Sequence, residues 1–532
     1  GGEESTEDRV PRTETGRTRY SLSTLCSLLS ALCSLLSAQD NAAMDFLIHL
    51  NGDSTRPLRD QIYDGLRLAI LDGEIAEGTR LPSSRTLATN LGVSRFTVTD
   101  AYNRLLSEGY VAGKHGSGTF VAPTAPVDQQ TAAITPAPET PARAWSRWSD
   151  RAQRLGTISE SPVEREIDFR HAMPDLSLFP HAVWRRLLVR ESKRLDLATR
   201  YYGHPAGWPD LRVALAGYLN RSRSIPCTPE QLIITSGCQE AVDLMARVWL
   251  DRGDAVAVEE PGYPRSRRTF AVAGAEIARV PVDHDGLQTD LLDTRAGNAK
   301  LIYVTPSHHY PTGAVLSLNR RLALLDWARS HGALVLEDDY NSEFRYGSRP
   351  IPAMAGLDAT TPGPGSVIYI GTMSKVLYPS LRLGYLVVPP DMLDRVLMAK
   401  EVSNRNAPHL EQATLAAFIT EGHFERHLNR VRKLYAERRK ALIAALDDEL
   451  GDRAYFDRSI SAAGLHLLVS FDASMSADEI ASRAATIGIH LDTALACYEQ
   501  TPDLPAFMLG YAALDEPTMR EGLRRLRELI AG

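Results

Sequence analysis

The stretch Tyr369–Tyr385 reads YIGTMSKVLYPSLRLGY, and it carries a lysine whose role depends on the fold around it. An apolar run at its start predicts a buried strand, and Lys375 follows that run in a turn rich in hydroxyl groups. Arg382 lies seven residues further on. Lys375 is either a solvated surface ammonium or the attachment point of a covalent cofactor, and the residues outside this stretch distinguish the two.

Other apolar runs alternate with helical stretches on the N-terminal side of Lys375. Strands are predicted at QLIITSG, AVAVEEP, KLIYVTP, ALVLEDD and SVIYIGT, and helices at EAVDLMARVWL and RRLALLDWARSHG. This alternation predicts an α/β domain built on a doubly wound, mostly parallel sheet. Ligands bind such sheets outside the carboxyl ends of the strands, so the polar residues at those ends are the site candidates.

Two of these strand ends carry groups suited to a phosphate and to a flat ring. In TSGCQEAVDL a strand ends and a helix begins, so the backbone N–H groups of Gly237 and Cys238 could hold a phosphate, although plain helix capping explains them equally. In EEPGYP, Tyr263 could stack on a flat ligand or pack on its own loop. Each feature alone is weak.

The strand ALVLEDD ends in three carboxylates, Glu337, Asp338 and Asp339. A buried carboxylate needs a partner, and a protonated ring nitrogen would serve. Together with Lys375, Thr372 and Arg382, these groups match pyridoxal 5′-phosphate chemistry: a Schiff-base lysine, an acid for the ring nitrogen, and a hydroxyl with an arginine for the phosphate.

The span from Asp168 to Gly532 resembles the fold-type I aminotransferases, with YYGHPAGWPDLRVALAGYL and TPSHHYPTG as further family segments. The resemblance implies a large pyridoxal-phosphate-dependent transferase domain whose lysine forms an internal aldimine. It assigns Lys375 as the Schiff-base residue, Asp338 as the partner of the pyridine nitrogen, Tyr340 as the O3′ partner, Tyr263 as the stacking ring, and Thr372 and Arg382 as phosphate ligands.

The chain departs from the aminotransferase pattern at two positions. Tyr310 stands before PTG, where the family usually has the Asn that bonds O3′. Met508 stands where an Arg usually clamps the substrate carboxylate, and methionine cannot make that charged bidentate contact. A carboxylate would then bind elsewhere, for example at Arg265. We therefore expect at most weak transaminase activity and favour regulation through the cofactor.

A second module precedes this domain. The segment GTRLPSSRTLATNLGVSRFTVTDAYNRLLSEGY predicts two helices, capped by Ser83 or Ser84 and by Ser94, around a turn at Gly92. Tyr110–Val121 then predicts a glycine-rich hairpin, or wing. The span resembles the GntR-type winged helix-turn-helix, and a degenerate module used for protein docking is the alternative.

The second helix begins with polar residues that point away from its apolar stripe and could reach DNA bases and phosphates. The predicted DNA-binding residues are Arg85, Ser94, Arg95, Thr97, Thr99, Lys114 and His115. Residues 45–121 hold eight basic and nine acidic residues, so binding depends on one face and fits a dimer on paired half-sites.

Length and composition limit the class of protein to which the chain can belong. The 532 residues carry 59 basic and 66 acidic side chains, a net charge of −7 with 44% hydrophobic content, as in a globular protein of several domains. Five scattered cysteines lack metal-ligand spacing and suit a reducing cytoplasm. No apolar run is long enough for a bilayer. LCSLLSA, repeated within Leu25–Ala38, faintly resembles a signal peptide, but a disordered extension is the preferred interpretation.

The predicted domain order is an extension (1–43), a GntR-type winged helix (55–123), a Pro/Ala/Thr-rich linker (124–165) and an aminotransferase-like domain (166–532). This is the architecture of the MocR/GabR regulators, which include a PdxR-like branch. It implies a cytoplasmic, homodimeric, DNA-binding regulator that senses pyridoxal phosphate or an amine or amino-acid effector and controls vitamin B6 or amine metabolism. The alternative is an active aminotransferase with a vestigial DNA-binding module.

Overall fold

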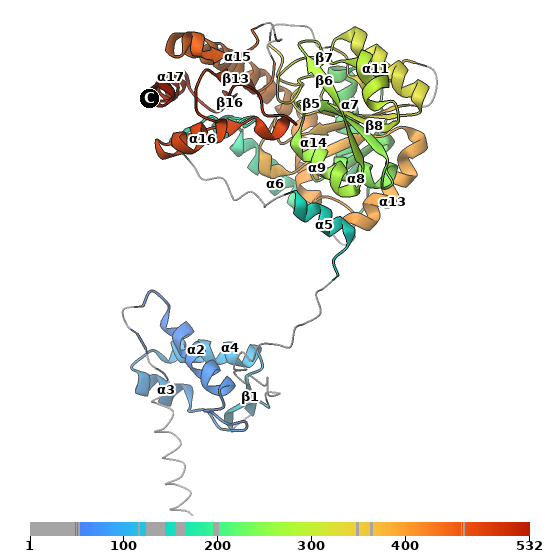
Figure 1. Cartoon of the computed structure of the whole chain (residues 1–532). Coiled ribbons are helices and arrows are strands. Elements are labelled where there is room, and N and C mark those ends of the chain that lie inside the picture. The colour runs from blue at the N-terminus through green and yellow to red at the C-terminus, as the bar shows by residue number, and fades with distance from the viewer. Residues whose placement is uncertain are drawn as a thin grey trace, which may run out of the picture. The chain divides into compact units, whose positions relative to one another are not determined.

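The structure is a computed structural model that describes residues 48, 50–51, 54–114, 117–123, 144–155, 165–194, 202–346, 351–361, 365–458, 460 and 463–531. The chain divides into two compact units, residues 1–142 and 143–532 (Figure 1). The predicted extension 1–43, His115 and most of the predicted linker lie outside the described residues.

The smaller unit is a winged helix-turn-helix, formed by α2 (Leu58–Leu71), α3 (Ser84–Leu91), α4 (Arg95–Ser107), β1 (Val111–Lys114) and β2 (Gly118–Val121). The predicted caps are confirmed: the Ser83 hydroxyl accepts from the N–H of Thr86, and the Ser94 hydroxyl accepts from the N–H of Thr97. Gly92 ends α3 at a φ of 65°, a left-handed conformation that favours glycine. β1 and β2 pair antiparallel as the wing.

The core of this unit comes from the apolar stripes of its three helices. Ile62 of α2 and Val98 and Leu105 of α4 are fully buried, and α3 adds Leu87. The helices therefore pack through the residues whose three- and four-residue spacing predicted them.

The span predicted as linker contains a helix, α5 (Arg147–Arg154), that belongs to the larger unit. The Ser146 hydroxyl caps α5 by accepting from the N–H of Ser149. Arg151 attaches α5 to the end of helix α9 (Pro264–Ala273), donating to the carbonyl oxygens of Val272 at 2.7 Å and Ala273 at 3.4 Å. α5 buries no residue, although the apolar residues Trp148, Ala152 and the C-cap Leu155 recur at spacings of four and three residues.

The larger unit is built on an eight-stranded sheet in the order β4-β11-β10-β9-β8-β5-β6-β7 (Figure 1). β10, β9, β8, β5 and β6 run parallel, whereas β11 is antiparallel to both β10 and β4. The strands are β4 (Leu232–Thr235), β5 (Ala255–Glu260), β6 (Glu276–Asp283), β7 (Gly286–Leu287), β8 (Ala299–Val304), β9 (Leu334–Asp339), β10 (Val367–Thr372) and β11 (Gly384–Val387). All five predicted strands are present, and the doubly wound sheet is confirmed.

Helices cover both faces of this sheet, so neighbouring residues of one strand enter different apolar cores. Ile233 packs with α8 and α13, and Ile234 packs in the larger core on the other face. The helices are α6 (His181–Arg194), α7 (Pro209–Arg223), α8 (Cys238–Trp249), α10 (Leu292–Ala296), α11 (Leu318–His331), α12 (Met354–Asp358), α13 (Leu393–Ser403) and α14 (His409–Thr420). α8 and α11 are the two that the sequence predicted.

The C-terminal part of the unit forms a second sheet, in the order β12-β13-β16-β15. Its strands are β12 (Ala454–Tyr455), β13 (His466–Phe471), β16 (Ala506–Gly510) and β15 (Asp492–Thr493), and its helices are α15 (His423–Glu449), α16 (Ala477–Thr486) and α17 (Glu516–Ala531). β3 (Ile167–Asp168) pairs with β14 (Ile489–His490), which brings the start of the unit beside its end. None of the described helices is long and apolar enough to cross a membrane.

Candidate functional site

The candidate site lies where the first sheet's strands end. Cys238 follows β4, Asp338 is the penultimate residue of β9, and Lys375 follows β10. Burial raises the pKa of the Cys238 thiol to about 12, and the charges of Asp338, Lys375 and Arg382 act on the same group. The structure therefore gathers residues from distant parts of the chain around one space, as their positions at strand ends predicted.

Lys375 occupies a half-buried position in this space. Burial lowers the pKa of its ammonium, and the positive charge of Arg265 lowers it further, while Asp338 and Asp492 act in the opposite direction. A lowered pKa increases the fraction of neutral amine, which is the nucleophilic form. The environment of Lys375 therefore differs from that of a solvated surface ammonium and favours its neutral form.

Asp338 has one oxygen bound and one oxygen free. The hydroxyl of Tyr303 donates to its Oδ2 at 2.6 Å, while Oδ1 is buried and has no hydrogen-bond partner among the described residues. Burial raises the pKa of this carboxyl to about 6. A buried acceptor without a partner is costly, and a protonated ring nitrogen would satisfy it. The sequence did not single out Tyr303.

The phosphate side of the site combines a helix N-terminus with an arginine. Gly237 precedes α8 with a φ of 86° and no side-chain cap. A Cβ at Gly237 would lie 3.2 Å from a guanidinium nitrogen of Arg382, so only glycine lets the arginine approach this backbone closely. Arg382 also donates to the carbonyl oxygen of Ser236 at 2.7 Å. Free N–H groups at a helix start beside a cation form an anion site.

The remaining predicted residues line the same region. Thr372 ends β10 as a buried residue, and its hydroxyl accepts from the N–H of Ser374 at 3.2 Å. The Tyr340 hydroxyl is buried and has no hydrogen-bond partner among the described residues. The Tyr263 ring meets the Tyr310 ring edge-on, with centroids 5.0 Å apart. Tyr340 can thus donate to a ligand oxygen, and Tyr263 forms an aromatic wall.

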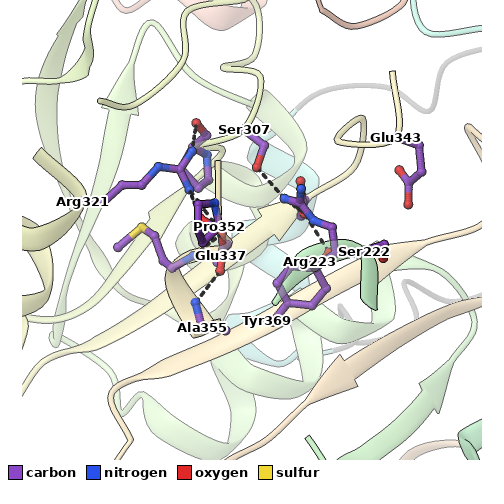
Figure 2. Close-up of polar contacts among 12 residues, drawn as sticks. Ser222, Arg223, Ser307, Arg321, Glu337, Glu343, Pro352, Ala355 and Tyr369 are labelled. Carbon is purple, nitrogen blue, oxygen red and sulfur yellow. Dashed lines mark hydrogen bonds and ion pairs between the residues drawn. The ribbon is translucent and has the colours of Figure 1, made fainter. Parts of the chain in front are cut away.

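Glu337 and Asp339, which flank Asp338, do not contribute to the site. Glu337 accepts from the N–H groups of Met354 and Ala355, each at 2.9 Å, and lies 3.9 Å from the guanidinium of Arg321 (Figure 2). Asp339 pairs with Arg223 and accepts from the hydroxyl of Tyr369. Side chains alternate along a strand, so the two neighbours share the face opposite Asp338.

A hydrogen-bonded chain that the sequence did not predict lies next to the site. The Tyr310 hydroxyl lies 3.0 Å from Nε2 of His171, and Nδ1 of His171 lies 2.5 Å from Oδ2 of Asp492. Asp492 also contacts His490 at 3.1 Å. Tyr310 was noticed as a departure from the family, but its partners lie in β15 and after β3, too far along the chain for any spacing rule to connect them.

The predicted effector residue Arg265 is exposed and lines a cavity of about 650 Å³ together with Arg382, Arg268 and Trp148 of α5. Met508 is buried on β16, in a cluster with Tyr310 and Tyr340. Met508 does not line that cavity, whereas Arg265 lines it together with Arg382, which the sequence predicted as a phosphate ligand.

In the winged helix, Arg85, Arg95 and Lys114 are exposed. Ser94 is occupied as the cap of α4, and the hydroxyls of Thr97 and Thr99 bond within the helix, to Ser94 Oγ at 2.7 Å and to the Arg95 carbonyl at 2.9 Å. The sequence analysis missed Phe96, which lies between Arg95 and Thr97 with 77% of its surface exposed. His115 lies outside the described residues. Arg85, Arg95, Phe96 and Lys114 are the side chains most available to a partner.

Two family models match the chain in the two units just described. The model for "Aminotransferase class I and II" matches residues 181–526, and the model for "Bacterial regulatory proteins, gntR family" matches residues 58–121. The fold and the site define a class of regulator in which a DNA-binding winged helix precedes an aminotransferase-like domain that uses pyridoxal 5′-phosphate. This chain belongs to the class I and II aminotransferase family and, through its gntR module, to the MocR-type transcription regulators.

Curated relatives share both units. The probable rhizopine catabolism regulatory protein MocR of Rhizobium meliloti is 38% identical over 90% of this chain and 95% of its own length. The transcriptional regulator TauR of Rhodobacter capsulatus is 32% identical over 90% and 97%. The pyridoxine biosynthesis regulator PdxR of Corynebacterium glutamicum is 30% identical over 92% and 99%.

Solved aminotransferases share the fold of the larger unit. The α-aminoadipate aminotransferase LysN of Thermus thermophilus, solved with N-(5′-phosphopyridoxyl)-L-leucine, is 28% identical, with a TM-score of 0.63 over 69% of this chain and 92% of that one. An archaeal alanine:glyoxylate aminotransferase is also 28% identical, with a TM-score of 0.63 over 73% and 96%.

Proposed function

We propose that this protein is a transcription regulator that senses pyridoxal 5′-phosphate, or an amine or amino-acid effector that meets it, through Lys375. Its targets are genes of vitamin B6 or amine metabolism. One observation carries the proposal: a partly buried lysine with a lowered pKa, and two buried polar atoms that lack a hydrogen-bond partner among the described residues, Asp338 Oδ1 and Tyr340 Oη, occur in the same chain as a gntR-family DNA-binding module.

The residues present fit the cofactor. When bound, pyridoxal phosphate supplies an aldehyde that reacts reversibly with amines and a ring that withdraws electrons. Lys375 would carry it covalently, Asp338 would hold the proton on the ring nitrogen, and the Tyr340 hydroxyl would donate to the ring oxygen. Arg382 and the start of α8 would hold the phosphate, with Thr372 beside them. Tyr263 would close one face of the ring against water.

The relatives support this role and its surroundings. Their names connect regulators of this architecture with pyridoxine biosynthesis and with rhizopine catabolism. For this chain we infer double-stranded DNA as the partner of the winged helix, with Arg85, Arg95 and Lys114 among its contacts. We further infer a homodimer that places two winged helices on paired half-sites, and a cytoplasmic location, where the DNA and the cofactor are available.

A gel-shift experiment tests the sensing role. DNA selected from a random pool by the full-length protein serves as the probe, with and without added pyridoxal phosphate. We expect the cofactor to change the DNA affinity of the wild type, and Lys375→Ala to bind DNA without responding to the cofactor. The exposed Lys440→Ala serves as the control and should behave like the wild type. A cofactor response that Lys375→Ala keeps in full would exclude Lys375 as the sensor.

Catalysis is the second candidate function. It is favoured by the complete set of Lys375, Asp338 and Tyr340, and by the 2-aminoadipate transaminase of Thermus thermophilus, which is 29% identical over 69% of this chain and 90% of its own length. Steady turnover of an amino acid with a keto acid at an enzyme-like rate, about 1–10³ s⁻¹, would establish catalysis as the main role. We expect turnover well below that range.

A further inference from the structure

Charged residues of both signs act on Lys375, and they come from two different regions of the larger unit. Arg382 and Arg265 lie near α8. The second sheet presents Asp492 from β15 directly beside Met508 from β16, and both Asp492 and Arg265 act electrostatically on Lys375. A ligand with its reactive group at Lys375 therefore meets cations from one region and an anion from the other.

Asp492 is held as an ionised, well-ordered acceptor. Its Oδ2 accepts from the backbone N–H of His171 at 2.9 Å as well as from the imidazole, and His490 lies against its Oδ1. Burial acts to raise the pKa of this carboxyl, but the hydrogen bonds from His171 and His490 outweigh it and hold the pKa well below its ordinary value. Asp492 is therefore negatively charged at neutral pH.

Permanent cations do not offset this charge. Among the described residues the ion-pair partners of Asp492 are two histidines, and neither an arginine nor a lysine forms an ion pair with it. The neighbouring surface is apolar and aromatic, made by Met508, Tyr310 and Tyr340. A carboxylate brought to this surface would face Asp492 and lose its water without gaining a cation, whereas an ammonium or a hydroxyl would gain an acceptor.

We propose that the effector of this regulator is a primary amine that lacks a carboxylate on its amine-bearing carbon and carries a second cationic or hydrogen-bond-donating group, which Asp492 accepts. This inference rests on the proposed function, since it specifies which effector the pocket at Lys375 takes. It makes Asp492 the specificity residue, with His171 and Tyr310 positioning it. An amino acid is disfavoured because its carboxylate has no partner beside Asp492.

Three amines of matched length test the proposal. Butylamine has one amine, putrescine has a second amine at the far end, and norvaline is butylamine with an added α-carboxylate. The readout is the absorbance of the cofactor bound to the full-length protein at neutral pH and constant ionic strength. We expect putrescine to shift the absorbance at a concentration at least about tenfold lower than either of the other two.

Variants connect the result to Asp492. Asp492→Asn keeps the acceptor for His171 but removes the charge, so putrescine should lose its advantage over butylamine. Met508→Arg adds a cation beside Asp492 and should move the preference from butylamine toward norvaline. The exposed Asp478→Asn on the same domain should behave like the wild type. Should Asp492→Asn fail to fold, the wild-type ratios and Met508→Arg still decide the question.

The contradicting outcomes are distinct. A norvaline response at the same or a lower concentration than that of putrescine would overturn the inference, and so would an unchanged putrescine-to-butylamine ratio in Asp492→Asn. If no amine changes the absorbance while the cofactor stays bound and still alters DNA binding, the effector class is wrong and the proposed function stands. If the wild type fails to hold the cofactor, the proposed function fails and this inference fails with it.

Discussion

At the residue scale, Asp338 shows that a residue of the candidate site can cost the protein folding stability. Its carboxyl is 3% exposed, with a pKa near 6 in the folded chain against 3.8 when unfolded. A raised pKa means that the folded protein favours the protonated form. The stability that this group contributes is therefore complete below pH 3.8 and is lost as the pH rises through 6.

Replacing Asp338 should separate stability from cofactor binding. Asp338→Asn keeps an acceptor for Tyr303 and removes the buried charge, so the cofactor-free protein should gain about 1–3 kcal/mol of unfolding free energy at pH 8. The same variant should lose bound cofactor. Urea unfolding at pH 8 and pH 5 measures the first effect, which should fade at pH 5, and absorbance measures the second.

An Asp338→Asn protein that still holds the cofactor as firmly as the wild type would show that Asp338 is not the ring-nitrogen partner. A variant less stable than the wild type at pH 8 would instead show that folding does not raise the pKa of the Asp338 carboxyl.

Arg95 gives the corresponding residue-scale prediction for the DNA-binding unit. It is exposed at the start of α4, and its Nε lies 3.3 Å from the hydroxyl of Ser84. Arg95→Ala should weaken DNA binding by about 1–3 kcal/mol and leave the cofactor absorbance unchanged. Fluorescence anisotropy with labelled DNA measures the first effect, and the exposed Arg453→Ala in the other unit is the control. Loss of the cofactor colour in Arg95→Ala would contradict the assignment of DNA binding to the smaller unit and of cofactor binding to the larger one.

At the element scale, the elements that the sequence predicted are those whose residues carry a local signal. The strands β4 and β10 are nearly continuous apolar runs, and Ser83 and Ser94 stand at the helix starts that they cap. The sequence singled out Asp338 and Lys375 as site candidates because parallel strands end at a common edge of the sheet. The chain of Tyr310, His171 and Asp492 could not be found this way, since His171 and Asp492 lie 321 residues apart.

The helix α5 was missed for a different reason. It forms through a serine cap and is held by one arginine at the end of α9, without any buried side chain. The apolar residues Trp148, Ala152 and Leu155 recur at helical spacings, but a helix of only 8 residues gives too short a pattern to stand out next to a Pro/Ala/Thr-rich stretch. Attachment through one arginine makes the docking of α5 sensitive to a single substitution.

Arg151→Ala should loosen α5 from α9. Removing hydrogen bonds worth about 0.5–1.5 kcal/mol should raise the population of undocked α5 by about 2- to 10-fold. Chymotrypsin cleavage at Trp148, which lies within α5, follows that population when local opening is fast. Arg154→Ala, one turn further along α5, is the matched control. Equal cleavage rates in the two variants would mean that Arg151 does not hold the helix.

At the scale of the whole molecule, the chain joins a DNA-binding unit to a unit that belongs to an enzyme family. The larger unit belongs to the class I and II aminotransferase family and holds Lys375, Asp338 and Arg382, the residues that we propose as its cofactor ligands. The second sheet, however, places Met508 of β16 directly opposite an ionised Asp492 of β15. We infer from this combination that the cofactor site of this chain reports a ligand to DNA more than it turns substrate over.

The most direct test of that claim follows cofactor and DNA in one titration. Cofactor-free, full-length protein with labelled DNA is titrated with pyridoxal phosphate while cofactor absorbance and DNA anisotropy are recorded together. We predict that the two signals change with the same midpoint, and that Lys375→Ala abolishes the coupled change in anisotropy. Saturation of the absorbance with no change in DNA binding at any protein concentration would contradict the account.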